Sequence, residues 1–340
     1  MWPSEIHDVY TVRPKVAIII LNYNGRDLLE RYLGSVESLE YSNYEILLVD
    51  NDSNDSSVNY IKKHHPDVTV VESKKNLGFS QGNNLGAASA ENADYYWFLN
   101  TDVRVTRESL NLLVNRVESK DDVGIVVPQI KNVDDGSIQS LGYKYGILGV
   151  PRAKTEVANE ELEKPHEITY GSGAALLIDS NVWEETGGFD DENFMYGDDT
   201  YLCLNAWLRG HRVEVVPNSV VYHEEGASQS KDQGPLIAYH NARGRTRCYL
   251  LTLESQSLVF GLVGFVSHSA IRVIKDLLNN NFETAAARTG GYLHTLLELP
   301  NVLSKRRQHQ RDRRLRDSQF LSRNIASEII HRSKPWNNKN

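Results

Sequence analysis

The sequence predicts an α/β fold built on a largely parallel sheet. Apolar stretches of strand length alternate with segments whose apolar residues recur at helical spacing, and the connections between them are short. Alternation of this kind is typical of βαβ units with right-handed crossovers. Three of the expected strands also end in turns rich in Asn and Asp, which favours a ligand site at the carboxyl edge of the sheet.

Each expected element follows from its own pattern. Residues 15–21 (KVAIIIL) are β-branched and apolar, whereas residues 27–39 place their apolar side chains at helical spacing. The remaining expected elements of the first part are a strand over 44–49, a polar helix over 55–65, a strand over 68–72, a helix near 81–91, a strand over 95–99, a helix over 110–117 and a strand over 123–127.

The stretch Tyr95–Asp102 is central to this prediction. Its apolar run is typical of a strand buried on both faces, and it stops at Asn100, Thr101 and Asp102. Asn and Asp oxygens suit Mg²⁺ or Mn²⁺, and such a metal can be shared with substrate phosphates. An Asn-x-Asp sequence after a strand is also an ordinary turn, so the motif alone leaves both interpretations open.

The polar ends of three strands together strengthen the prediction of a ligand site. Because parallel strands share a direction, Asn22, Asp50, Asn51, Asn100 and Asp102 are expected to converge in one crevice. Convergence of this kind is harder to explain as turn chemistry alone.

A Gly-containing loop is expected over residues 76–86 (NLGFSQGNNLG). Its glycines permit close approach of a backbone, and its amides can donate to and accept from a nucleotide or sugar. The chain has no GxxxxGK[ST] sequence, and no GxGxxG opens the helix after the first strand. A Walker-type ATPase or a dinucleotide dehydrogenase is therefore disfavoured.

The second part of the chain adds two further candidates. Residues 131–167 are irregular and are compatible with a hairpin that touches a second substrate, and strand character returns over 170–178. Asp198 and Asp199 precede a helix, where they serve either as capping carboxylates or as a general base whose proton affinity is raised by its neighbour. His223 follows a short apolar strand and is either structural or a metal ligand.

Charge divides the chain into an acidic body and a basic tail. The net charge of −8 is the sum of −18 over residues 1–230 and +10 over residues 231–340, which suggests separate jobs for the two parts. Such a tail either meets something anionic or docks on the body. Two cysteines without metal spacing favour a reducing, cytoplasmic setting. No opening signal peptide and no apolar run long enough to span a membrane is evident, so an integral membrane protein is not expected.

Together these segments resemble a family 2 glycosyltransferase with the GT-A fold. The resemblance covers about residues 14–230 and keeps the family's order. The matching segments are VAIIILNYNG (16–25), EILLVDNDSNDSS (45–57), NLGFSQGNNLG (76–86), WFLNTD (97–102), GGFDDENFMYGDDTYLCL (187–204) and VVYHEEGAS (220–228). The LNTD form and the NLGF loop are most similar to rhamnosyltransferase-like members that act on cell-surface glycans. The resemblance implies a Rossmann-like, mostly parallel central sheet flanked by helices, as a catalytic domain over 14–230, with a basic, mostly helical extension over 231–340.

The resemblance also assigns roles to residues. Asn100 and Asp102 take the place of the family's Asp-x-Asp metal and diphosphate motif, with Asn100 a departure from the usual carboxylate, and His223 completes the metal site. Asp199 is the expected base, and Asp198 replaces the Glu that usually precedes it. The expected donor contacts are Asn22, Asp50, Asn51, Gly78, Gln81, Asn84, Asn100 and Asp102.

The implied activity is inverting, metal-dependent transfer of one sugar. The donor would be a nucleotide-diphosphate sugar, with dTDP-rhamnose as one candidate, and Mg²⁺ or Mn²⁺ would be the cofactor. The acceptor would be a hydroxyl of a cell-surface glycan or a lipid-linked saccharide. Absence of the Gln-x-x-Arg-Trp motif of processive synthases favours transfer of a single residue. A sugar nucleotidyltransferase and a non-catalytic glycan-binding or scaffold protein are the alternatives.

The basic run Lys305–Arg316 leads to an expectation about location. Near apolar helices such a run can hold a protein against an anionic leaflet, so peripheral association with the inner face of the plasma membrane is expected. Nucleic-acid binding is the competing interpretation of this tail, but no nucleic-acid motif supports it.

Overall fold

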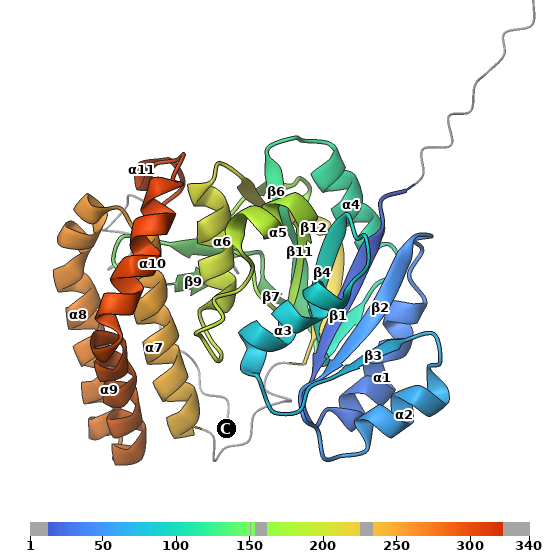
Figure 1. Cartoon of the computed structure of the whole chain (residues 1–340), viewed down its shortest axis with the longest axis horizontal. Helices are drawn as coiled ribbons and strands as arrows, with labels where there is room; N and C mark the ends of the chain where they lie inside the picture. Colours follow the sequence, from blue (N-terminus) through green and yellow to red (C-terminus); the bar gives the residue numbers. More distant parts are fainter. Residues whose placement is uncertain (1–12, 150, 154–161, 225–233, 322–340) are drawn as a thin grey trace, which may run out of the picture.

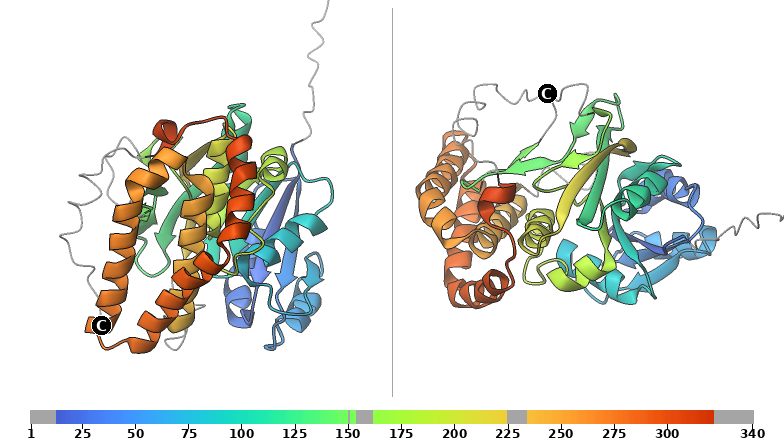
Figure 2. Two further views of the ribbon diagram at one scale, coloured as in Figure 1. Left: turned by 60° about the vertical axis from the view of Figure 1, so that its left-hand side comes forward. Right: turned by 90° about the horizontal axis from the view of Figure 1, so that it is seen from above.

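The computed structural model describes residues 13–149, 151–153, 162–224 and 234–321. A twisted sheet forms its centre, with helices on both faces (Figure 1). A further group of helices from the C-terminal part of the chain packs beyond one of these helical layers, as the two turned views in Figure 2 show.

The main sheet has the strand order β10-β12-β6-β11-β4-β1-β2-β3, and β5 and β7 pair at β12 and β6. The strands of this sheet are β1 (Val16–Asn22), β2 (Tyr44–Asp50), β3 (Thr69–Glu72), β4 (Tyr95–Asn100), β5 (Val103–Val105), β6 (Val123–Asn132), β7 (Ile138–Ser140), β10 (His166–Glu167), β11 (Ala175–Asp179) and β12 (Arg212–His223). A separate hairpin joins β8 (Tyr143–Tyr145) to β9 (Pro151–Ala153), within the segment where the sequence left a hairpin open.

The sheet is mixed rather than parallel throughout. β1 to β4 run parallel to one another, as expected from their helical crossovers. β11, however, lies antiparallel between β4 and β6, because the chain reaches it through the irregular segment after β6 and not through a crossover helix. The α/β prediction is confirmed, and the antiparallel strand is the detail that the sequence pattern missed.

The helices place a layer on each face of the sheet. In chain order they are α1 (Arg26–Glu37), α2 (Ser57–His64), α3 (Gly78–Ser89), α4 (Ser109–Glu118), α5 (Ser180–Thr186), α6 (Asp198–Leu208), α7 (Gly234–Thr252), α8 (Ser255–Leu278), α9 (Phe282–Leu297), α10 (Leu299–Arg311) and α11 (Asp317–Phe320). Alternate residues of β4 serve the two layers: Trp97 packs in the core shared with α1 and α4, and Phe98 in the core shared with α3, α5 and α6.

The expected loop over 76–86 is helical for most of its length. α3 begins at Gly78, and two of its glycines lie directly against β1. A Cβ atom would come within 2.4 Å of Leu21 at Gly82 and within 2.4 Å of Ile19 at Gly86. The glycines therefore allow α3 to approach the sheet closely, which offsets their low helix propensity.

The C-terminal helices dock on the acidic body of the chain. α7 packs against α6 and α9, and Gly244 lies so close to the carbonyl oxygen of Tyr196 that any Cβ would be 1.9 Å from it. Arg247 is buried and bonds Asp190 at 3.0 Å and Glu192 at 2.6 Å, while Lys305 reaches Asp190 at 2.7 Å. Basic residues of the C-terminal part therefore form ion pairs with acidic residues of the first part of the chain. The expected boundary at residue 230 lies outside the described residues.

One helix corrects the expectation about membrane segments. α8 is 24 residues long, has a mean hydropathy of 1.7 over its most apolar stretch, and is only 11% buried there. By length and composition it is apolar enough to cross a membrane. A search for an unbroken apolar run does not detect this helix, because Ser267, His268 and Ser269 interrupt the run without making the helix polar.

Candidate active site

The carboxyl edge of the parallel strands holds a closely linked set of polar side chains. At the end of β1, Asn22 donates from Nδ2 to the Oδ1 of Asp50 at 3.0 Å and to the Oγ of Ser53 at 3.0 Å. Asn51 accepts from the backbone N–H of Leu77 at 2.7 Å, which ties the end of β2 to the start of α3. All three predicted residues at the ends of β1 and β2 are buried, so they form the floor of this edge.

Asp102 and His223 meet although they are far apart in the sequence. Antiparallel pairing of β5 with β12 sets His223 opposite Val103, and His223 Nε2 lies 3.3 Å from Asp102 Oδ1. The other ring nitrogen, Nδ1, lies 3.0 Å from the side-chain oxygen of Gln139. Asp102 is buried, and Asn100 ends β4 with a half-buried side chain. This edge therefore presents the Asp102 carboxylate in contact with the His223 imidazole, and Asn100 lies two residues before Asp102 at the end of β4.

These three side chains fit a divalent cation that is shared with a diphosphate. A carboxylate oxygen and an imidazole nitrogen are ordinary ligands of Mn²⁺, and an amide oxygen is an ordinary ligand of Mg²⁺ or Mn²⁺. Among the described residues there is no group of three or more His, Cys, Asp or Glu side chains that could hold a metal alone. The donor set is thus one that substrate phosphates and water would complete.

Asp199 lies in the first turn of α6, next to the turn that precedes β11. Its Oδ2 accepts from the backbone N–H of Gly173 at 3.1 Å, and its Oδ1 accepts from the N–H of Thr200 at 2.6 Å. Ala174, the residue after Gly173, accepts through its carbonyl oxygen from the N–H of Asn100 at 3.0 Å. Asp199 is half-buried, and burial raises the pKa of its carboxyl, although these hydrogen bonds act against the shift. A half-buried carboxylate is thus held one strand away from Asn100.

Asp198 points into the protein instead. Only 3% of it is exposed, and its Oδ1 accepts from Ser80 of α3 and from Asn193 Nδ2, the latter at 2.6 Å. Burial raises the pKa of Asp198 to about 7, and the nearby Asp199 charge adds to the shift. Asp198 therefore joins α3, the 190–197 loop and α6, which is the work of a positioning residue.

The three residues predicted to contact the donor from α3 hold the loop before Asp198. Gln81 Nε2 donates to the carbonyl of Asp191 at 2.6 Å, and Asn84 both donates to and accepts from the backbone of Phe189 at 3.1 Å. Gly78, with φ of 75°, leaves space for Phe194, whose carbonyl oxygen would lie 2.3 Å from a Cβ. These three residues thus hold the loop in place. Gln81 or Asn84 could contact a sugar donor only if that contact replaced these hydrogen bonds.

The structure also brings in residues that the sequence did not single out. Gln139 orients His223 from β7, in the segment where no element was assigned. Next to His223, Glu224 accepts from the hydroxyl of Tyr32 at 2.6 Å and pairs with Arg31 on α1. Neither Gln139 nor the Tyr32 and Arg31 pair has a sequence signal, because each is placed by strand pairing or helix packing alone.

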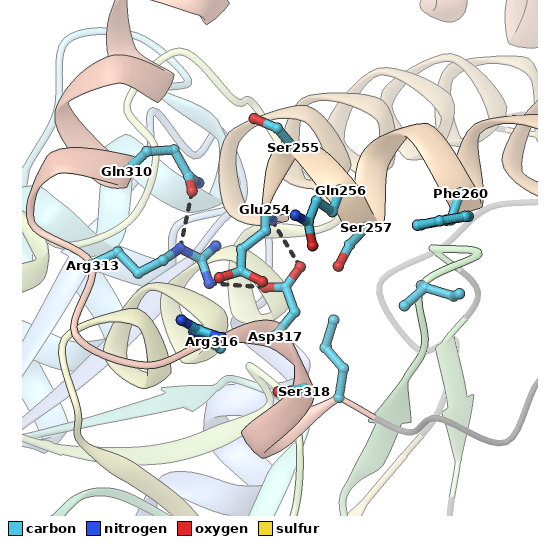
Figure 3. Close-up of a pocket in the computed structure, with 12 residues that line it drawn as sticks. Glu254, Ser255, Gln256, Ser257, Phe260, Gln310, Arg313, Arg316, Asp317 and Ser318 are labelled. Atoms are coloured by element: carbon cyan, nitrogen blue, oxygen red, sulfur yellow. Dashed lines mark hydrogen bonds and ion pairs between the residues drawn. The ribbon is translucent and has the colours of Figure 1, made fainter.

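A distinct pocket of about 710 Å³ lies away from this edge (Figure 3). It opens between the start of α8 and the α10 to α11 turn, where Arg313 bonds Asp317 and the N–H of Glu254 donates to Asp317. No residue predicted for the active site lines it.

Comparison with known proteins assigns the family. The family described as "Glycosyl transferase family 2" matches residues 17–185. The chain is 26% identical over 247 residues to N-acetylglucosaminyl-diphospho-decaprenol L-rhamnosyltransferase of Mycobacterium tuberculosis, covering 66% of this chain and 80% of that protein. It is 25% identical over 217 residues to Rhamnosyltransferase WbbL of Escherichia coli, covering 59% of this chain and 80% of that protein.

Solved structures agree on the fold. The crystal structure of GalNAc-T7 with UDP, GalNAc and Mn²⁺ superposes with a TM-score of 0.61 at 20% identity, covering 74% of this chain and 50% of the other. TarS residues 1–349 of S. aureus with UDP-GlcNAc gives a TM-score of 0.57 at 16% identity, covering 87% and 89%. Sheet topology, the family match and these likenesses agree, and the chain belongs to the family 2 glycosyltransferases, with a GT-A fold and a rhamnosyltransferase-like sequence.

Proposed function

We propose that this glycosyltransferase moves one sugar from a nucleoside-diphosphate donor to an acceptor hydroxyl with inversion at the anomeric carbon. The observation that carries the proposal is the placing of Asp199. Its half-buried carboxylate is fixed by Gly173 and Thr200, and the Gly173–Ala174 turn joins it to Asn100 at the end of β4. A base and a diphosphate site on neighbouring strand ends are what a single displacement requires.

In this reaction Asp199 accepts the proton of the acceptor hydroxyl. The acceptor oxygen forms a bond to the anomeric carbon while the bond from that carbon to the diphosphate oxygen breaks, and the nucleoside diphosphate leaves with the electron pair. The raised pKa of Asp199 suits this role, because a carboxylate with higher proton affinity is a stronger base.

Asp102, His223 and Asn100 are the residues that would face the diphosphate. We assign to them the holding of a divalent cation, Mg²⁺ or Mn²⁺, which when bound neutralises charge on the leaving diphosphate. Gln139 keeps the His223 ring oriented through its contact at 3.0 Å. Two of the solved structures with this fold were determined with Mn²⁺ and a nucleotide or nucleotide sugar, which supports the assignment.

We propose dTDP-rhamnose as the donor and a lipid-linked or cell-surface saccharide as the acceptor. The names of two relatives support this choice, one a decaprenol-linked L-rhamnosyltransferase and one a rhamnosyltransferase. On this proposal the enzyme works in the cytoplasm at the inner face of the membrane, where it meets its acceptor. Asn22, Asp50 and Asn51 then form the floor beneath the nucleoside.

The test is a donor screen on the full chain. Thermal melting is followed with dTDP-rhamnose, UDP-sugars and GDP-sugars, each with and without Mn²⁺ or Mg²⁺. We expect dTDP-rhamnose with metal to raise the melting temperature most, and its turnover to release dTDP when a lipid-diphosphate-linked N-acetylglucosamine acceptor is added. Equal stabilisation by a UDP- or GDP-sugar with transfer from that donor would overturn the choice of donor. Equal stabilisation with and without metal would overturn the assigned cation.

A further inference from the structure

An exposed apolar surface lies on the C-terminal helices α8 and α9. Its centre, here called the apolar face, is formed by Val259, Phe260, Val263, Val266 and Leu278 of α8 together with Leu297 of α9. Phe260 is 79% exposed and Leu297 is 82% exposed. Soluble surfaces rarely leave so many neighbouring large apolar side chains in water, so the face favours an apolar partner.

The opposite side of α8 is already packed against the body. Phe265 stacks on Tyr249 of α7 with ring centroids 4.2 Å apart, and Gly261 lies against the carbonyl oxygen of Ile147. In both Figure 1 and Figure 2 α8 and α9 lie at the edge of the molecule opposite β2 and β3. The apolar face is therefore the outer face of a docked helical layer and not a core surface.

Charge around the apolar face points to an anionic partner. Lys275 is exposed on α8 itself, and Arg316 lines one pocket together with Phe260. Arg307 and Arg311 are exposed on α10, whereas Arg314 pairs with Glu185 of α5 at 3.5 Å, and the exposed acidic residues of 255–321 are Glu283 and Asp312. An apolar surface with a basic rim matches the hydrocarbon and anionic headgroups of a lipid leaflet.

The rest of the basic run is turned inward. Arg306 donates to the carbonyls of Leu250 and Leu253 at 2.6 Å, and Arg313 pairs with Asp317 at 2.9 Å. Part of the basic run thus serves contacts within the protein, because several of its charges hold α7, α10 and α11 together.

We propose that the apolar face inserts into the surface of an anionic bilayer. In this arrangement α8 lies in the plane of the membrane interface and does not cross the bilayer. Both ends of α8 are tied to neighbouring C-terminal helices. The N–H of Glu254 donates to Asp317 at 2.8 Å, and Asp276 bonds Arg288 of α9 at 2.6 Å. A spanning α8 would have to break these bonds and its stack on Tyr249. The inference extends the proposed function, because a lipid-linked acceptor would lie in the same bilayer, but it does not depend on sugar transfer.

Vesicle flotation of the full chain tests this inference without donor or acceptor. The wild type is mixed with phosphatidylglycerol and phosphatidylcholine vesicles, and with pure phosphatidylcholine vesicles. The test variant carries Phe260→Glu and Val263→Glu. The matched control carries Asn59→Glu and Asn115→Glu, which add the same charge at exposed positions of α2 and α4.

We expect the wild type and the control to float with anionic vesicles. The fraction of the test variant that floats should be lower by roughly ten-fold or more. Binding to neutral vesicles and binding in high salt should both be weaker than binding to anionic vesicles in low salt. Circular dichroism verifies folding, and Val266→Glu with Ile274→Glu is the second variant if the first does not fold.

Three results would overturn the inference. The wild type would stay in solution with every vesicle, or the test variant would float as well as the control, or bound protein would resist alkaline carbonate extraction as a spanning helix does. A wild-type dimer in solution that Phe260→Glu with Val263→Glu converts to a monomer, without vesicle binding, would show a second copy to be the occupant instead. Because no sugar donor is present, each result stands apart from the outcome of the donor screen.

Discussion

Replacement of the buried Asp198 by Asn should make the protein more stable at neutral pH. Folding takes the carboxyl from its ordinary pKa of 3.8 to about 7, because only 3% of the residue is exposed. Below pH 3.8 the carboxyl is protonated in both states and adds no cost. As the pH rises from there to about 7, the unfolded chain loses the proton while the folded protein keeps it, so stability falls.

The size of this effect follows from the pKa difference. A shift from 3.8 to about 7 corresponds to about 4 kcal/mol once both states are ionised. Between pH 5 and pH 8 the wild type should lose roughly 2 to 3 kcal/mol of stability through this group alone. Asn keeps the shape and can accept from Ser80 and Asn193 as Asp198 does, so Asp198→Asn should lack this loss.

Urea denaturation at pH 5 and pH 8 measures the difference. The stability of the variant relative to the wild type should increase by roughly 2 to 3 kcal/mol between the two values of pH. Asp191→Asn, at an exposed position of the same loop, is the control and should show no such change. If Asp198→Asn destabilises the protein by more at pH 8 than at pH 5, the ionised carboxylate is stabilised by its two donors, and the reasoning from burial fails.

Two further perturbations test other parts of the account. Arg247→Met leaves the carboxylate of Asp190 buried beside fewer cations, so unfolding by urea should show a loss of roughly 3 to 5 kcal/mol; a change under 1 kcal/mol would show the pair to be dispensable. Asp102→Ala removes the carboxylate from the proposed cation site, so calorimetry should show Mn²⁺-dependent binding of the donor nucleotide weakened by roughly 10- to 100-fold. Binding without metal should stay as in the wild type, and an equal loss in both conditions would indicate misfolding instead.

The sequence predicts the first part of the fold well because local patterns decide it. In β1, β2 and β4 nearly every residue is buried, so these strands are continuous apolar runs, and their polar ends mark the edge where the site forms. β11 was harder, since its direction depends on how the irregular segment before it returns to the sheet, and no local pattern records that path.

The site residues also differ in whether a local sequence pattern or only tertiary packing decides their place. The meeting of Asp102 with His223 came from a family resemblance, because the pairing of β5 with β12 joins residues that no spacing rule connects. The amides of Gln81 and Asn84 look equally suited to a ligand or to a neighbouring backbone. Only tertiary packing shows that both bind the loop over 189–191. Composition likewise hid the exposed apolar side of α8, because a charge count reports the basic rim and not the side chains within it.

The change of Asp199 to Asn is the most direct test of the proposed chemistry. The amide keeps the size of the side chain and can still accept from Gly173, but it cannot take a proton from the acceptor. We predict that kcat for release of the nucleoside diphosphate in the presence of acceptor falls by roughly 10²- to 10⁴-fold, while calorimetric affinity for the donor nucleotide stays at the wild-type value. Unchanged kcat in Asp199→Asn would contradict the assignment of Asp199 as the base.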